Sequence, residues 1–251
     1  MSDNWDVYFT TINDHFASVL IDMGIAEEAP DSRRPWLLYV WVKLNDPDEH
    51  GMIAADEFES INQVEDNLVH EVANSARAVH VGSVTREGRR EFYFYAPTPR
   101  GFAEAVTRVM ESIGTHQWNF ASKEDPEWEH YLQTMYPTIY DRQVMHNRKV
   151  LDALSEAGDK LEKERAVFHW AYFTGEGARR QFIDAIQLRG FALDDQLHSD
   201  TPDDPYPYGV TFNRIDPLHW NTINDITIEL WELAESLEGS YDGWETSVEK
   251  D

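Results

Sequence analysis

The order of hydrophobic and polar positions predicts two successive sets of strands and helices with the same arrangement. Alternating or continuous apolar stretches indicate strands, and apolar residues at three- and four-residue spacing indicate helices. The clearest helical stripe consists of Ile223, Ile226, Leu230, Leu233 and Leu237. It is followed by the stretch 239–246, which combines two glycines, two large aromatic residues and two acids. We expect that stretch to be a last strand that closes a small sheet.

Each set is predicted to run strand, helix, strand, strand, helix, strand. In the first set, strands are expected at 36–44, 77–86, 89–96 and 117–123, and helices at 54–73 and 99–113. In the second set, strands are expected at 161–173, 191–198, 208–214 and 239–246, and helices at 177–189 and 217–238, with Asp216 as the cap of the last helix. A hairpin (4–12 and 15–23) precedes the first set, a helical turn from 126 follows it, and a helix (138–157) precedes the second.

This order is the ferredoxin-like arrangement, in which helices cover one face of an antiparallel sheet. The expected fold class is therefore α+β, with two ferredoxin-like (βαββαβ) units, each an antiparallel sheet with helices on one face. Pro137 marks the expected boundary, so that an N-terminal α+β domain occupies 1–137 and a second domain 138–251. The halves share no repeat of individual residues, and their similarity is one of architecture.

The net charge of −26 indicates which classes of partner the protein repels and which it attracts. Residues 1–137 carry 24 acids against 10 bases and the remainder 23 against 11, so the charge is spread over both halves. Such a field repels nucleic acids and anionic lipid surfaces and attracts basic proteins. Solubility is the alternative explanation of an acidic surface.

Several classes of chemistry are disfavoured by the residues present. The chain has no cysteine, and its ten histidines form no zinc-binding motif. The longest apolar run, 36–42, is too short to cross a bilayer, and the first residues do not resemble a signal peptide. We therefore expect a cytoplasmic protein that has no catalytic residues, binds no cofactor or metal and does not contact a membrane.

Three local features have both a structural and a functional interpretation. His169 lies among aromatic residues of a strand, where a packed core histidine is the favoured interpretation. Gly175 and Gly177 precede two arginines at a helix start and could form an anion site, although the dinucleotide fingerprint is incomplete and a tight turn is favoured. Residues 89–95 combine arginines with aromatics as RNA-recognition strands do, but the negative field favours a structural role.

The second half resembles the bacterial family called regulator of ribonuclease E activity B. The resemblance covers about 138–246 and is carried by 150–159, 167–170, 189–191 and above all Tyr241-Asp-Gly-Trp-Glu-Thr246. The first half is similar to an uncharacterised bacterial domain found alone or fused ahead of such a module. Stand-alone family members have a long acidic tail after the closing motif, whereas this sequence ends at Asp251. Binding that depends on the tail would be absent here.

The resemblance implies a non-enzymatic regulator that inhibits RNA cleavage by binding ribonuclease E, a protein with basic surfaces, without contacting nucleic acid directly. Charge complementarity is consistent with this, because an acidic module can compete for RNA-binding surfaces. The alternative is a small-ligand-binding protein or uncharacterised enzyme that uses the cleft between the halves.

Two groups of residues are candidates for the interaction. The acids Asp225, Glu229, Glu232 and Glu235 are expected on the exposed side of the last helix, where ordinary solvation is the alternative. In the closing strand the candidates are Tyr241, Asp242, Trp244 and Glu245. Tyr241 and Trp244 are candidate anchors because aromatic residues dominate interface hot spots, and core packing is their alternative.

Overall fold

The computed structural model describes residue 2 and residues 4–250, which form two compact units, Met1–Asp141 and Arg142–Asp251. The division falls within helix α3 (Ile139–Glu156). Among the described residues, no helix is both long and apolar enough to span a bilayer.

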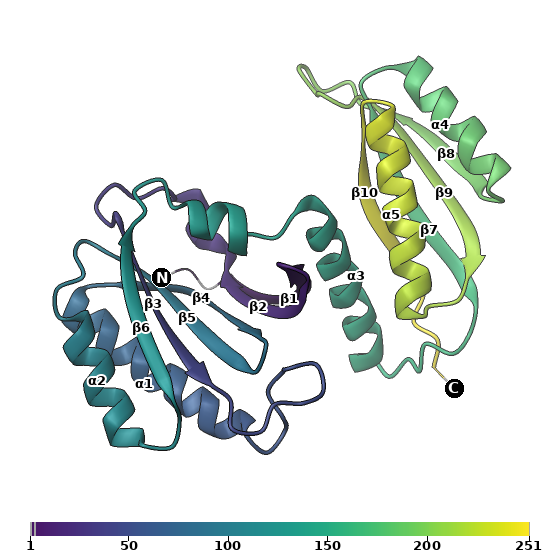
Figure 1. Cartoon of the computed structure of the whole chain (residues 1–251). Coiled ribbons are helices and arrows are strands. Elements are labelled where there is room, and N and C mark those ends of the chain that lie inside the picture. Colours follow the sequence, from purple (N-terminus) through teal and green to yellow (C-terminus); the bar gives the residue numbers. More distant parts are fainter. Residues whose placement is uncertain (1, 3, 251) are drawn as a thin grey trace. The chain divides into compact units, whose positions relative to one another are not determined.

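The first unit is built on a six-stranded antiparallel sheet. Its strands are β1 (Trp5–Ile12), β2 (His15–Asp22), β3 (Trp36–Lys43), β4 (Val79–Arg86), β5 (Arg89–Ala96) and β6 (Trp118–Glu124), in the order β1-β2-β4-β5-β3-β6. The four strands β4-β5-β3-β6 have the ferredoxin-like order, and the β1–β2 hairpin extends the sheet beyond β4. Helices α1 (Phe58–Ala76) and α2 (Phe102–Ile113) lie side by side on one face (Figure 1).

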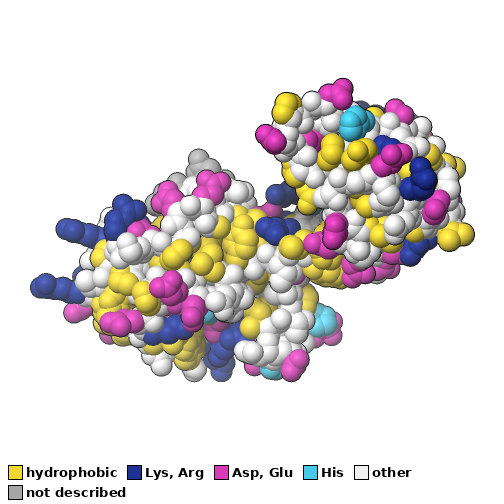
Figure 2. Space-filling model, turned by 90° about the horizontal axis from the view of Figure 1, so that it is seen from above, with side chains coloured by type: hydrophobic (Ala, Val, Ile, Leu, Met, Phe, Trp, Pro, Cys, Tyr) yellow, Lys and Arg dark blue, Asp and Glu magenta, His cyan; other side chains and the backbone are white. Residues whose placement is uncertain are grey.

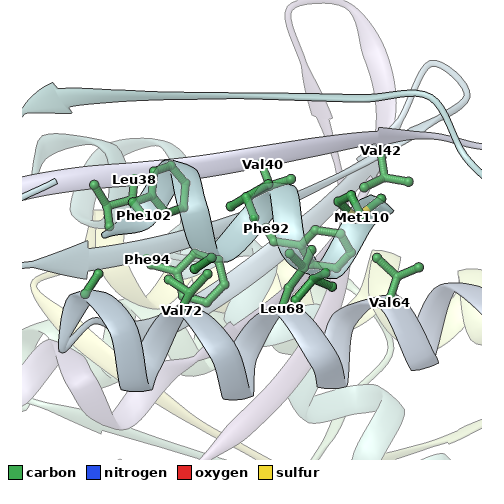
Figure 3. Packing of buried hydrophobic residues seen from close by; sticks show 14 of the residues in the cluster. Leu38, Val40, Val42, Val64, Leu68, Val72, Phe92, Phe94, Phe102 and Met110 are labelled. Carbon is green, nitrogen blue, oxygen red and sulfur yellow. The ribbon is translucent and has the colours of Figure 1, made fainter. Parts of the chain in front are cut away.

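The core of this unit lies between the two helices and the sheet. Figure 3 shows Val64, Leu68 and Val72 of α1 directed at Phe92 and Phe94 of β5. The apolar residues at helical spacing in the predicted helix 54–73 therefore form the buried side of α1, and burial of such a surface is the main stabilising contribution to the fold. The phenylalanines near Arg89 and Arg90 are part of this core, and these arginines pair with Glu91 and Glu65. The phenylalanines and the two arginines of this strand thus have structural partners, as the favoured interpretation expects.

Both hairpins of the sheet close with two-residue turns of left-handed residues. Asn13 and Asp14 have φ of 51° and 66°, and Glu87 and Gly88 have φ of 50° and 70°. Positive φ at both central positions matches the twist of paired strands, which explains why Asn-Asp and Glu-Gly mark the turns.

The other face of the first sheet is covered by the segment after β6. The carboxylate of Asp125 accepts hydrogen bonds from the backbone N–H groups of Glu129 and His130, so it caps the turn. The helix that follows is a six-residue π-helix, η2 (His130–Met135), instead of an α-helix. Its Tyr131 and Met135 are fully buried, and the hydroxyl of Tyr8 on β1 donates to the carbonyl of Met135 at 2.7 Å.

The second unit contains a four-stranded antiparallel sheet in ferredoxin-like order. Its strands are β7 (Arg165–Phe173), β8 (Ala192–His198), β9 (Tyr208–Asp216) and β10 (Gly239–Thr246), in the order β10-β7-β9-β8. Helices α4 (Glu176–Leu188) and α5 (Trp220–Ser236) cover one face (Figure 1). The predicted fold class, two ferredoxin-like units with antiparallel sheets, is confirmed.

Several predicted element ends are wrong. Asp216 is the last residue of β9, paired with Arg165 of β7, and α5 begins four residues later with His219 as its cap. Strand β7 begins at Arg165 instead of 161, because the preceding residues form a turn in which Asp159 binds Arg165. Helical spacing places Tyr140 on the same side of α3 as Leu151 and Leu154, yet Tyr140 is exposed, whereas Met145 of the same helix is buried.

Candidate protein-binding surfaces

A β-bulge in β10 places both aromatic residues of the closing motif on the same face of the second sheet. Tyr241 pairs with Ala171 of β7, Gly243 with Trp170 and Trp244 with His169, so four residues of β10 lie opposite three of β7. Asp242 is the residue without a partner, and Gly243 next to it has φ of 118°, a conformation that glycine adopts without strain. The two side chains therefore point toward the helices and are only 8% and 5% exposed.

Tyr241 forms a buried polar pair with His169. The Tyr241 hydroxyl lies 2.9 Å from Nδ1 of His169, which is fully buried and stacked on Phe212. Burial lowers the pKa of His169 to about 3, with a smaller contribution from the charge of Arg214. His169 is therefore the core histidine that the sequence favoured, neutral at physiological pH.

Trp244 belongs to a hydrogen-bonded network that joins α3, α5 and β10. Its indole Nε1 donates to Oδ1 of Asn147 at 2.8 Å. The amide nitrogen of Asn147 in turn donates to Asn224 Oδ1 at 2.8 Å and to Thr227 Oγ1 at 2.7 Å. Leu151, Leu154 and Ile223 are packed in the same cluster as Trp244. In this conformation Tyr241 and Trp244 hold the strand in place, while Asp242 and Glu245 between and after them are exposed.

The candidate acids of α5 all lie on its exposed side. The opposite side of the helix buries Ile223, Ile226 and Leu230 against the sheet. Asp225, Glu232 and Glu235 are exposed, and exposed Glu229 pairs with Arg189 at 2.6 Å. The charge of Glu229 is thus partly compensated within the unit. Asp and Glu side chains are also spread over the face of both units seen in Figure 2.

The structure reveals a further surface, the side of the second sheet opposite α4 and α5, which we call the open face. Its central strand contributes Phe168, Trp170 and Tyr172, which alternate with the inward residues Val167, His169 and Ala171. None of the three aromatic side chains is buried; Phe168 is 37% exposed and the neighbouring Ile215 on β9 is 67% exposed. No helix in the described part of the second unit covers these residues.

The charged groups of the open face are acidic. Asp195 lies opposite Thr211 of β9, and Glu245 lies opposite Phe168. The pKa of Tyr172 is raised, first by partial burial and then by the charge of Asp242. The four strands, all of which the structure describes, contain two basic residues, Arg165 and Arg214. Both arginines pair with carboxylates away from the open face.

Arg165 pairs with buried Asp159, and Arg214 pairs with Asp216 and covers the ring of Phe191 in the helix-side core. The open face thus consists of a row of aromatic residues accompanied by carboxylates. No lysine or arginine of the four strands lies on it. The sequence contained its signal, aromatic residues at every second position of 168–172, but the alternation alone does not tell which side the helices cover.

The glycine turn before α4 does not offer the arginines that an anion site would need. Arg179 is buried and donates to the carbonyl oxygens of Leu197 and Gly209. Arg180 pairs with Glu176 of its own helix at 3.6 Å. The favoured interpretation, a tight turn, agrees with these contacts.

The fold and these surfaces define a two-unit α+β protein with a ferredoxin-like sheet in each unit. Its residues 3–136 match the family model of DUF695, a family of unknown function, and the chain belongs to that family. Residues 144–246 match the family model described as regulator of ribonuclease activity B. The two resemblances predicted from the sequence are confirmed, and the second unit is similar to regulators of ribonuclease activity.

Other comparisons add little. No curated protein matches the chain. A crystal structure provisionally described as a glycine cleavage system transcriptional repressor is 8% identical, with a TM-score of 0.27, and covers 84% of this chain and 98% of its own. A crystal structure of an unknown protein from Galdieria sulphuraria is 9% identical, with a TM-score of 0.23, and covers 85% and 99%. Scores this low do not indicate a shared overall fold.

Proposed function

We propose that this protein is a non-enzymatic regulator that restrains RNA cleavage by binding a ribonuclease of the ribonuclease E type in the cytoplasm. The observation that supports the proposal most directly is the open face, whose aromatic row is accompanied by carboxylates and lacks a strand cation. It occurs in the unit that matches the family of ribonuclease regulators.

The chemistry of the open face favours a basic protein segment over RNA. RNA-recognition modules with the same element order stack bases on aromatic residues of this side of the sheet, but they also need cations for the phosphates. Here Asp195 and Glu245 would repel phosphates. Arginine or lysine side chains of a partner can instead lie over the rings of Trp170 and Tyr172 and pair with these carboxylates.

The acids of α5 have a different part in the proposal. Asp225, Glu232 and Glu235 lie on the opposite side of the unit from the open face, exposed to solvent. Exposed charges of this kind accelerate encounter with a basic partner and add little to the strength of the final contact. Tyr241 and Trp244 support the surface indirectly, because they fix β10, which carries Asp242 and Glu245.

The test is the rate of RNA cleavage by purified ribonuclease E with increasing amounts of the full chain. We expect inhibition that is stronger at about 0.05 M than at about 0.5 M salt, because salt screens the attraction between opposite charges. A variant with Trp170→Ala and Glu245→Lys should inhibit less, whereas Leu188→Ser, at a highly exposed position of α4, should inhibit like the wild type. Unchanged cleavage together with absence of binding would refute the proposal.

A further inference from the structure

The sheet of the first unit is wider than its helical layer. Strands lie about 4.8 Å apart, so the β1–β2 hairpin adds about 10 Å to the sheet. Packed helices lie about 8–10 Å apart, so this addition equals the width of one further helix. In the described structure α1 and α2 pack over the ferredoxin-like strands, and the hairpin extends beyond β4 on the side of α1. The hairpin therefore leaves a place one helix wide next to α1.

The hairpin surface at this place is apolar. Residues of β1 and β2 that point to the helix side include Trp5, Val7, Phe9, Phe16 and Leu20, which we call the hairpin strip. Ser18, opposite Phe9, and Thr11, opposite Phe16, lie on the same side. The rings of Phe9 and Phe16 are stacked, with centroids 5.6 Å apart, and these side chains are 55% and 45% exposed. The alternate residues, such as Tyr8, Ala17 and Val19, are buried on the other face of the sheet. The strip is thus a second apolar side of the hairpin, which is unusual for exposed strands of a monomer.

A groove of about 560 Å³ separates the hairpin strip from α1. One wall is formed by Trp5 and Leu20, and the other by α1, which contributes Val69 and Ala73. The polar residues of the α1 wall are Glu65, Asp66, His70 and Asn74. His80 lies between the two walls, buried, with its ring 5.3 Å from that of Trp5. Burial lowers the pKa of His80 to about 4, so this side chain is neutral at physiological pH.

The charge at the groove is negative. Glu65 is compensated by Arg90, whose Nη2 lies 2.7 Å from its carboxylate. Asp66 is exposed on the α1 wall and has no basic partner in the described structure. Lysine and arginine are absent from the described residues that line the groove. A positively charged side chain next to Asp66 would therefore be attracted.

We propose that this groove binds one amphipathic α-helix of a partner protein. The apolar stripe of that helix packs on the hairpin strip and on Val69 and Ala73, and lysine or arginine residues at its flank pair with Asp66. The occupant follows from three observations, namely the width of the place, its apolar walls and its negative edge. The groove belongs to the first unit, so this binding is independent of the ribonuclease contact proposed for the second.

The test is a selection from a displayed library of helical peptides on the full chain. The peptides have fixed apolar residues at helical spacing and randomised flanking positions. Peptides are counter-selected on Ala73→Arg, which fills the groove from the α1 wall, and on Phe9→Ser, which replaces an exposed residue of the strip. Circular dichroism of both variants verifies that they fold.

We expect enriched peptides to carry lysine or arginine at one flank. Both variants should weaken binding about tenfold or more, the size of an interface hot-spot effect, and Asp66→Lys should reverse the preference of the flank. Three results would overturn the proposal: no peptide that depends on the groove, flanks without enrichment of cations, or a dimer of this chain that Phe9→Ser abolishes, since the occupant would then be a second copy. Inhibition of ribonuclease E by Ala73→Arg should equal that of the wild type.

Discussion

The indole Nε1 of Trp244 on β10 donates a hydrogen bond to Oδ1 of Asn147 on α3, a residue 97 positions earlier in the chain. Asn147 is fully buried, and its side-chain amide nitrogen donates hydrogen bonds to Asn224 and Thr227 of α5. A buried amide is favourable only when its polar atoms are paired, so the four residues form one cooperative group. The closing motif thus has a structural function in addition to the charges that it presents.

Trp244→Phe should destabilise the second unit. The substitution leaves Oδ1 of Asn147 with a longer contact of 3.4 Å from Gln143 as its remaining partner. We expect the free energy of unfolding to fall by about 1–3 kcal/mol, as for other buried acceptors that lose a donor. Urea unfolding measures the change. Trp170→Phe on the open face is the matched control, and a similar loss in both variants would show that the hydrogen bond is unimportant.

Gly243→Ala should also lower stability, through the backbone. Gly243 has φ of 118°, which residues with a Cβ adopt only at a cost of about 1–3 kcal/mol. The added Cβ would also lie 3.2 Å from Nε2 of His146, an exposed side chain that can move. Gly177→Ala in α4 is the control, because no atom lies within 4 Å of its added Cβ and alanine favours a helix. Equal stability of the two variants would contradict the role of the bulge.

The element order could be predicted from the sequence, whereas the bulge and its consequences could not. Helical stripes such as Val64, Leu68 and Val72 repeat locally, so their pattern identifies the buried side of α1 without knowledge of the fold. Strict alternation from Tyr241, by contrast, would place Trp244 on the other side of the sheet. Only the pairing with β7 shows that the extra residue, Asp242, brings both rings inward. The partners of Asn147 are likewise too distant in sequence for a local pattern.

Stability should fall in acid partly because of His169. The pKa of this histidine is about 6.5 in the unfolded chain and about 3 in the folded chain, so the unfolded state binds the proton more readily. The contribution of neutral His169 to the free energy of unfolding is therefore fully present above pH about 6.5 and is lost as the pH falls toward about 3. It is on the order of 3–5 kcal/mol, since one pKa unit corresponds to about 1.4 kcal/mol.

The double variant His169→Phe with Tyr241→Phe isolates this contribution. It removes both polar partners of the buried pair, a change that can be nearly neutral at pH 7 because neither partner is left unpaired. Urea unfolding at a series of pH values should then show a smaller loss of stability between pH 6.5 and 4 than in the wild type. Buried His80 and His130 of the first unit, whose pKa values are lowered to about 4, remain unchanged in both proteins. Identical pH dependence in the two would rule out His169 as a contributor.

The acids of α5 should affect the association rate of ribonuclease binding, and the open face should affect the dissociation rate. Replacing Asp225, Glu232 and Glu235 by glutamine removes exposed charge without altering the buried side of α5. We expect slower association and a weaker dependence on salt, with little change in the dissociation rate. Trp170→Ala on the open face removes an uncharged contact area, which should accelerate dissociation and leave the salt dependence unchanged.

Surface plasmon resonance with immobilised ribonuclease E, at several salt concentrations, separates these effects. Glu229→Gln should change association less than any of the other three acids, because Arg189 already compensates its charge. If the glutamine variants change dissociation while Trp170→Ala changes only association, the assignments of the two surfaces are reversed. If neither variant affects binding, the contact with the ribonuclease lies outside both surfaces.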